Sequence, residues 1–325
     1  MSNITQLSNG VRSGNIRSLA KAITLIESHS PDHSQEATDL LDNLLPDSGN
    51  SIRIGISGVP GVGKSTFIEA LGMTLLQQGH KIAILAVDPS SQISGGSILG
   101  DKTRMEELAR EKNAFIRPSP AGKSLGGVAR KTRESMLLCE AAGYDIIIVE
   151  TVGVGQSEIT VASMVDFFLL LQLSNAGDEL QGIKKGVMEI ADAILINKAE
   201  GENRPRAELA RQQYENALHL LKPKSLNWQV PVLLCSALHQ QGIEEIWQIV
   251  LNFIATMKQH GEFEDKRRLQ ATDWMWTLVM EDLKDLFLRD KNVAAMIDQV
   301  QTGVSQGNTS PSVAARRLLG AFRRH

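Results

Sequence analysis

Apolar residues follow three patterns along the chain, and these patterns divide it into three parts. Over residues 1–50 they recur at helical spacing in two segments, which predicts a helical N-terminal arm. Over residues 51–257, short runs of Ile, Leu and Val alternate with helix-like stretches, as expected for buried parallel strands and the helices between them. Over residues 258–325 the strand pattern stops and apolar residues mark one face of a long helix, which predicts a helical C-terminal arm.

The middle part predicts an α/β fold with a doubly wound, mostly parallel sheet. Ligands of such sheets bind outside the carboxyl ends of the strands, so we look for chemistry where each strand ends. The strand candidates are residues 52–57, 82–87, 145–149, 167–173, 193–197 and 230–235.

The first of these strands leads into a phosphate-binding motif, G-x-x-x-x-G-K-[ST], followed by a helix-like segment over 67–78. Its glycines let backbone N–H groups turn towards a phosphate, and the helix N-terminus adds the positive end of its dipole. Lys64 would neutralise the outer phosphates, and the Ser65 hydroxyl would bind Mg²⁺. We therefore predict that a nucleoside triphosphate binds this loop, which consists of Gly58, Val59, Pro60, Gly61, Val62, Gly63, Lys64, Ser65 and Thr66.

Two carboxylates directly follow predicted strands, Asp88 after 82–87 and Glu150 after the run of Ile and Val that ends at Val149. A carboxylate in this position is costly unless it faces a cation or solvent. Each could simply cap the next helix. Beside a phosphate-binding loop, a role in holding Mg²⁺ is favoured, and Asp101, in a Gly- and Ser-rich loop, could also reach the triphosphate.

Two further strand ends indicate which base is bound. Asn197, Lys198 and Glu200 fit the N-K-x-D box that reads guanine, except that the fourth residue is Glu and its acceptor lies one methylene further out. Cys235, Ser236 and Ala237 resemble the loop whose backbone N–H contacts guanine O6. Together these boxes favour GTP over ATP.

Composition and charge limit the classes of partner and the cellular compartment that we expect. A net charge of −3 over 325 residues argues against nucleic-acid binding. Cys139 and Cys235 lie far apart, which fits a reducing compartment. The N-terminus lacks the layout of a signal peptide, and the apolar run from Phe167 to Leu171 is too short to span a bilayer. We expect a cytoplasmic protein without a membrane partner.

The C-terminal arm carries Leu269, Trp276 and Leu283 at seven-residue intervals. This face could pack on its own domain, or it could be a dimer seam. The residues alone do not choose between these two arrangements.

Taken together, these motifs resemble the MeaB/ArgK/MMAA family of P-loop GTPases, which act as chaperones for adenosylcobalamin-dependent acyl-CoA mutases such as methylmalonyl-CoA mutase. The resemblance covers nearly the whole chain. It rests on residues 58–66, 87–91, 95–105, 117–127, 150–158 and 177–186.

The resemblance implies roles for single residues. Lys64 and Ser65 would hold phosphate and Mg²⁺, while Asp88, Asp101 and Glu150 match the acidic metal and switch residues of the family. Residues 178–185 match a further switch loop that couples the nucleotide state to the mutase, and Lys184 is its expected contact. The family is homodimeric, which favours the interpretation that the apolar face of the arm over 258–325 forms a dimer seam.

We expect slow GTP hydrolysis that gates cofactor loading or protection of the mutase. Three alternatives stay open on the sequence: a small-molecule kinase, a metal-insertion GTPase and a nucleotide-dependent binding module. The metal-insertion hypothesis is the weakest, because the seven histidines are scattered rather than clustered.

Overall fold

The computed structural model describes residues 3–28, 30–87, 105–118, 125–151, 156–174 and 185–322. The chain separates into two compact units, Met1–Lys266 and Arg267–His325. Among the described residues, no helix combines the length and the apolar character that crossing a membrane requires.

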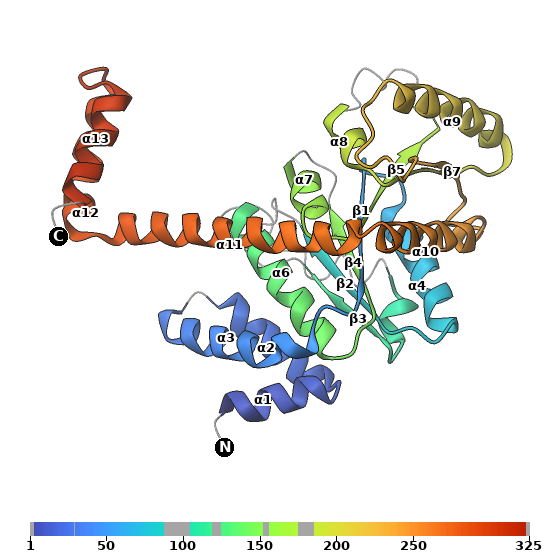
Figure 1. Cartoon of the computed structure of the whole chain (residues 1–325), viewed down its shortest axis with the longest axis horizontal. Helices are drawn as coiled ribbons and strands as arrows, with labels where there is room; N and C mark the ends of the chain where they lie inside the picture. The colour runs from blue at the N-terminus through green and yellow to red at the C-terminus, as the bar shows by residue number, and fades with distance from the viewer. Residues whose placement is uncertain are drawn as a thin grey trace. The chain divides into compact units, whose positions relative to one another are not determined.

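A seven-stranded sheet in which every pairing is parallel forms the centre of the first unit (Figure 1). The predicted doubly wound α/β fold is therefore confirmed. The central strand β1 lies between β4 and β5, so its carboxyl end is flanked by the ends of both. In spatial order the strands are β3 (Ala114–Arg117), β2 (Ile82–Val87), β4 (Ile146–Thr151), β1 (Ile52–Gly58), β5 (Phe167–Leu173), β6 (Ala193–Asn197) and β7 (Val232–Leu234).

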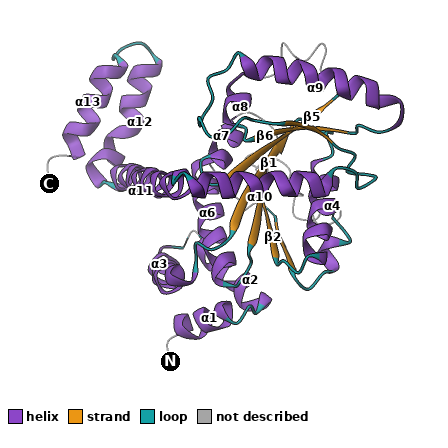
Figure 2. Cartoon of the chain, turned by 45° about the vertical axis from the view of Figure 1, so that its right-hand side comes forward, coloured by secondary structure: helices purple, strands orange, loops and turns teal. Residues whose placement is uncertain are grey.

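Helices cover both faces of this sheet (Figure 2). Successive side chains of a strand point to opposite faces, so alternate residues of β4 enter different cores. Ile146 and Ile148 pack with helices α4 (Lys64–Gln77) and α10 (Ile243–Gln259). Ile147 and Val149 pack into the other core, against α6 (Leu125–Ala141) and its neighbours. Burial on both faces explains why the strands are continuous apolar runs.

The second face also carries the helices that surround α6. They are α1 (Asn3–Arg12), α2 (Ile16–Glu27), α3 (Pro31–Leu44), α7 (Gln156–Ala162), α8 (Lys185–Ile190) and α9 (Arg204–His219). The three N-terminal helices contribute Val11, Leu19 and Leu40 to its core, each fully buried. The predicted helical arm is thus part of the core of the first unit.

A buried ion pair fastens α6 to the start of β1. Glu140 on α6, whose side chain is 1% exposed, accepts from Arg53 Nε at 2.8 Å and Ser51 Oγ at 2.6 Å. Burial alone would raise the pKa of Glu140, but the hydrogen bond and charge of Arg53, with the donors of Ser51 and Gly49, hold it below its ordinary value.

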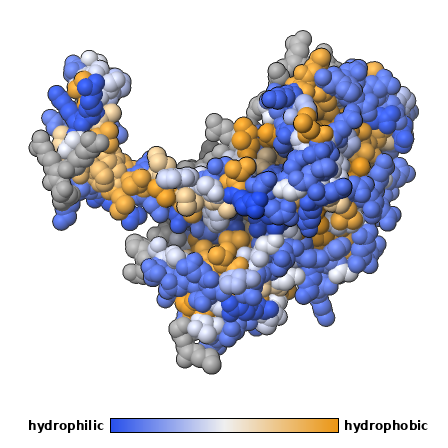
Figure 3. All heavy atoms as spheres, viewed as in Figure 1, coloured by the Kyte–Doolittle hydropathy of each residue, from blue (hydrophilic) through white to orange (hydrophobic). Residues whose placement is uncertain are grey.

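The second unit contains most of α11 (Glu262–Arg289), with α12 (Lys291–Ser305) and α13 (Pro311–Phe322). Large apolar side chains are exposed along α11, as Figure 3 shows. Trp276 is 59% and Met280 64% exposed in the single chain. The predicted apolar face is therefore present on α11, with large apolar side chains among its exposed residues.

Candidate nucleotide site

The phosphate-binding motif forms the turn between β1 and α4. Gly63 has φ of +92°, and a Cβ there would lie 2.8 Å from Asn197 Nδ2. A Cβ on Gly58 would lie 2.5 Å from the backbone oxygen of Leu171. Glycine is required at both positions, at the first for backbone conformation and space and at the second for space.

Lys64 opens helix α4 and reaches back across its own loop. Its Nζ donates to the backbone oxygens of Gly58 at 2.7 Å and Val59 at 3.4 Å. The ammonium group is therefore held within the turn, next to the helix N-terminus, whose first N–H groups have no intrahelical acceptors. A cation and several N–H groups directed at one point form an anion site.

The acidic strand end lies beside this turn. Glu150 on β4 pairs in register with Ile56 on β1 and Ala86 on β2, and it is half-buried. The next residue, Thr151, donates from Oγ1 to Ser57 Oγ at 2.8 Å and ties the two strand ends together. Glu150 and the half-buried Ser65 hydroxyl supply oxygen ligands of the kind that Mg²⁺ accepts.

Three predicted site residues lie outside the described residues: Asp88, Asp101 and Lys184. Val87 is the last described residue before Asp88, and it pairs with Thr151 where β2 and β4 end side by side. Within the described part of the chain, no group of three or more His, Cys, Asp or Glu side chains could hold a metal ion. Among the described residues, Ser65 and Glu150 are the candidates for holding Mg²⁺ beside the bound phosphates.

Asn197 joins the phosphate loop to both base boxes. Its side chain is buried and donates from Nδ2 to Val62 O at 2.8 Å. Its Oδ1 accepts from Ala237 N at 3.1 Å and from Cys235 Sγ at 3.2 Å. The sequence predicted Asn197 as a base reader but gave no sign of these three contacts, since Val62 is 135 residues away.

Lys198 makes a second connection to the loop. Its exposed side chain donates from Nζ to Gly61 O at 2.8 Å, and its φ of +61° is unusual for a residue with a Cβ. A backbone conformation of this kind persists where surrounding contacts hold it. Asn197 and Lys198 thus fix the phosphate loop at neighbouring carbonyl groups.

Glu200 follows as the last residue of the base box. Its Oε2 is buried and has no hydrogen-bond partner among the described residues. A buried acceptor without a donor costs free energy, and a ligand N–H would remove that cost. The N1–H and N2–H groups of guanine are such donors.

The base loop, Cys235 to Ala237, is held by backbone contacts at the end of β7. Cys235 N donates to Ile196 O at 2.9 Å, and Ala199 N donates to Cys235 O at 2.9 Å. Burial, followed by the charge of Glu200, raises the pKa of the Cys235 thiol to about 12, so the thiol keeps its proton at neutral pH. The sequence predicted that a backbone N–H of this loop contacts guanine O6, and in this structure the Ala237 N–H donates to Asn197 Oδ1.

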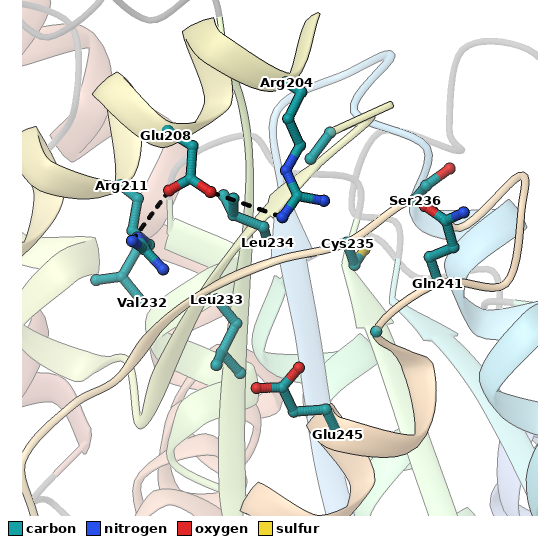
Figure 4. Close-up of a pocket in the computed structure, with 12 residues that line it drawn as sticks. Arg204, Glu208, Arg211, Val232, Leu233, Leu234, Cys235, Ser236, Gln241 and Glu245 are labelled. Carbon is teal, nitrogen blue, oxygen red and sulfur yellow. Dashed lines mark ion pairs between the residues drawn. The ribbon is translucent and has the colours of Figure 1, made fainter. Parts of the chain in front are cut away.

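A cavity of about 220 Å³ lies beside the base loop, lined in part by Ala199, Cys235 and Ser236 (Figure 4). On α9, Glu208 pairs with Arg211 at 3.0 Å and with Arg204 at 3.7 Å, so both ion pairs run along this one helix. The three side chains belong to the lining of the cavity. The phosphate loop does not line this cavity.

Residues 19–292 match the family model described as "Methylmalonyl Co-A mutase-associated GTPase MeaB". The chain belongs to the MeaB family. With its P-loop fold, it is a GTPase of this family, as the sequence predicted.

Relatives of this MeaB-family chain span nearly its whole length. It is 51% identical to a probable GTPase of Mycobacterium tuberculosis, over 96% of the chain and 93% of the relative. It is 48% identical to the GTPase ArgK of Escherichia coli, over 95% and 93% of the two proteins. It is 45% identical to the mouse mitochondrial methylmalonic aciduria type A homolog, over 98% of the chain and 80% of the relative.

A solved structure described as a LAO/AO transport system kinase is similar to this MeaB-family fold. It has a TM-score of 0.79 and 41% identity, and the match covers 99% of each chain. The fold is therefore shared with an experimental structure over nearly the whole length of both chains.

Proposed function

We propose that this GTPase is a Mg²⁺-dependent chaperone that gates cofactor loading or cofactor protection in an adenosylcobalamin-dependent acyl-CoA mutase, with methylmalonyl-CoA mutase as the first candidate. The observation that supports the partner is the family match over residues 19–292, together with a 45% identical relative named for methylmalonic aciduria. The cytoplasmic location predicted from the sequence is part of this proposal.

In the proposed site, each described residue has one task. Lys64 and the N-terminus of α4 bind the phosphates, and Asn197 and Lys198 hold the loop against the base region. Ser65 and Glu150 hold Mg²⁺, which when bound would neutralise charge that develops on the phosphates. Glu200 accepts from the guanine base through a carboxylate that is already partly desolvated. Asp88, Asp101 and Lys184 keep the roles that the sequence predicted.

The protein would act as a homodimer. The apolar face of α11 leaves Leu269, Trp276 and Met280 more than half exposed, an unusual arrangement for a monomer. A second copy that presents the same face would bury it, in the symmetric manner usual for homodimers.

The experiment is a mixing assay with purified methylmalonyl-CoA mutase. We expect a complex on size-exclusion chromatography whose amount differs between GDP and a non-hydrolysable GTP analogue. Absence of a complex with either nucleotide would remove the chaperone role and leave the GTPase assignment intact.

Phosphotransfer to a small acceptor is the second candidate, because the 41% identical solved structure is described as a kinase. Labelled GTP separates the two functions. Free phosphate is expected from a hydrolase, whereas label on an acceptor would favour a kinase.

A further inference from the structure

Helix α7 connects the two strands that flank the phosphate-loop strand. Both β4 and β5 pair with β1 in parallel, so the chain between them returns from the carboxyl ends of the strands to their amino ends. Helix α7 lies on this return path. Its first residues therefore point towards the edge of the sheet that carries Glu150 and the phosphate loop, and its last residues point towards the opposite edge.

The C-terminal end of α7 is held by α6. Arg133 on α6 donates from Nη2 to the backbone oxygen of Ser163 at 3.0 Å and to its Oγ at 2.8 Å. Ser163 directly follows the helix, and its Oγ donates to Thr160 O at 2.7 Å. A cation at this end supplies donors to carbonyl groups that lack intrahelical partners and faces the negative end of the helix dipole.

The central strand holds the same end of the helix. Gly55 lies within β1, and a Cβ there would lie 2.9 Å from Val161 Cγ1 and 2.9 Å from Val165 Cγ2. Both valines are fully buried. A glycine inside a strand permits this close approach, so the C-terminal half of α7 is fixed between α6 and β1.

The N-terminal end of α7 is different, because it carries a buried hydroxyl without a partner. Ser157 is 1% exposed, and its Oγ has no hydrogen-bond partner among the described residues. Ser57, which is also fully buried, accepts from Thr151 Oγ1 at 2.8 Å. A buried hydroxyl that lacks a partner costs free energy, so the position of α7 described here is unfavourable at Ser157.

We propose that Ser157 is a positioning residue for the GTP-bound state, in which the N-terminal end of α7 shifts and the Ser157 hydroxyl gains a hydrogen-bond partner. Arg133 and Gly55 hold the other end, so the helix turns about its C-terminus. A ligand shifts such an equilibrium only if it favours one of the two positions. The third phosphate distinguishes GTP from GDP, and it binds at the edge of the sheet towards which Ser157 lies. The inference therefore rests on the phosphate site of the proposed function.

The test compares the affinities of the full-length protein for labelled GDP and for a labelled non-hydrolysable GTP analogue. Ser157→Ala should weaken binding of the analogue by about three- to tenfold, the value of one hydrogen bond, and leave GDP affinity within about twofold. The same variant should unfold at an equal or higher temperature than the wild type when no nucleotide is added, because it removes a hydroxyl that is buried without a partner.

The matched control is Ser163→Ala, the same substitution at the other end of α7. It removes a hydroxyl that has partners, while Arg133 still reaches the backbone oxygen of residue 163. This variant should unfold at a lower temperature and keep the wild-type ratio of the two affinities.

Three results would overturn the role of Ser157. They are an unchanged ratio of affinities in Ser157→Ala, a lower unfolding temperature of that variant without nucleotide, and an equal change of the ratio in Ser163→Ala. Failure of the wild type to bind either nucleotide would instead overturn the phosphate site of the proposed function.

Discussion

Replacement of Glu200 by Gln tests whether this residue reads the base. Its Oε2 is buried without a hydrogen-bond partner among the described residues, next to Asn197 and the base loop. Guanine offers two N–H donors, and a hydrogen bond to a charged acceptor contributes roughly 1.5–3 kcal/mol. Loss of the charge at one such bond corresponds to about a ten- to hundredfold weaker affinity for GDP.

The assay compares GDP with inosine diphosphate, which lacks the 2-amino donor. We expect the wild type to prefer GDP by about tenfold or more, and the Glu200→Gln variant to lose most of that preference. Glu202→Gln is the matched control, since it removes the same charge two residues away from an exposed side chain. If Glu200→Gln kept both the affinity and the preference of the wild type, the base would not be read by this carboxylate.

Three further substitutions, one of them with a matched control, test the phosphate site, the buried ion pair and the dimer interface. Lys64→Ala should abolish GTP turnover, because it removes the ammonium group held at Gly58 O, and unchanged phosphate release would contradict the assignment. Glu140→Gln should lower the free energy of unfolding in urea by roughly 3–5 kcal/mol, since it leaves the charge of the partly buried Arg53 without its carboxylate partner. The control is Asp47→Ala, which breaks an ion pair with both side chains 39% exposed and should cost less than about 1 kcal/mol. In the folded protein the pKa of Glu140 lies below its ordinary value of 4.5. The ionised carboxylate therefore stabilises the fold fully above pH 4.5, and this contribution is lost as pH falls through the folded pKa. The Glu140→Gln variant should consequently lose less stability on acidification than the wild type. Trp276→Glu should convert a dimer to a monomer in light scattering, and an unchanged mass would exclude the α11 face as the seam.

The sequence predicted the central sheet well because its strands are buried on both faces. Strands 82–87, 167–173 and 193–197 have the predicted bounds. In contrast, β3 was missed, since Ala114–Arg117 is a four-residue edge strand with an Arg at its end. Strand β7 is shorter than predicted and begins after Pro231, which has no N–H to donate.

The motifs of the site were visible in the sequence, but its contacts were not. Spacing identified Asn197 and the phosphate loop separately, because each motif is local. The hydrogen bond from Asn197 to Val62 and the thiol contact of Cys235 depend on how distant strand ends meet. No local pattern records such contacts, so they emerged only from the structure.

The central claim is that nucleotide turnover is coupled to a mutase partner. The most direct measurement is phosphate release from GTP while purified methylmalonyl-CoA mutase is added in increasing amounts, with Lys64→Ala as the blank. The account predicts slow release by the GTPase alone and a saturable change in rate as the mutase is added. A rate that stays constant over the whole titration, with no complex formed, would contradict it.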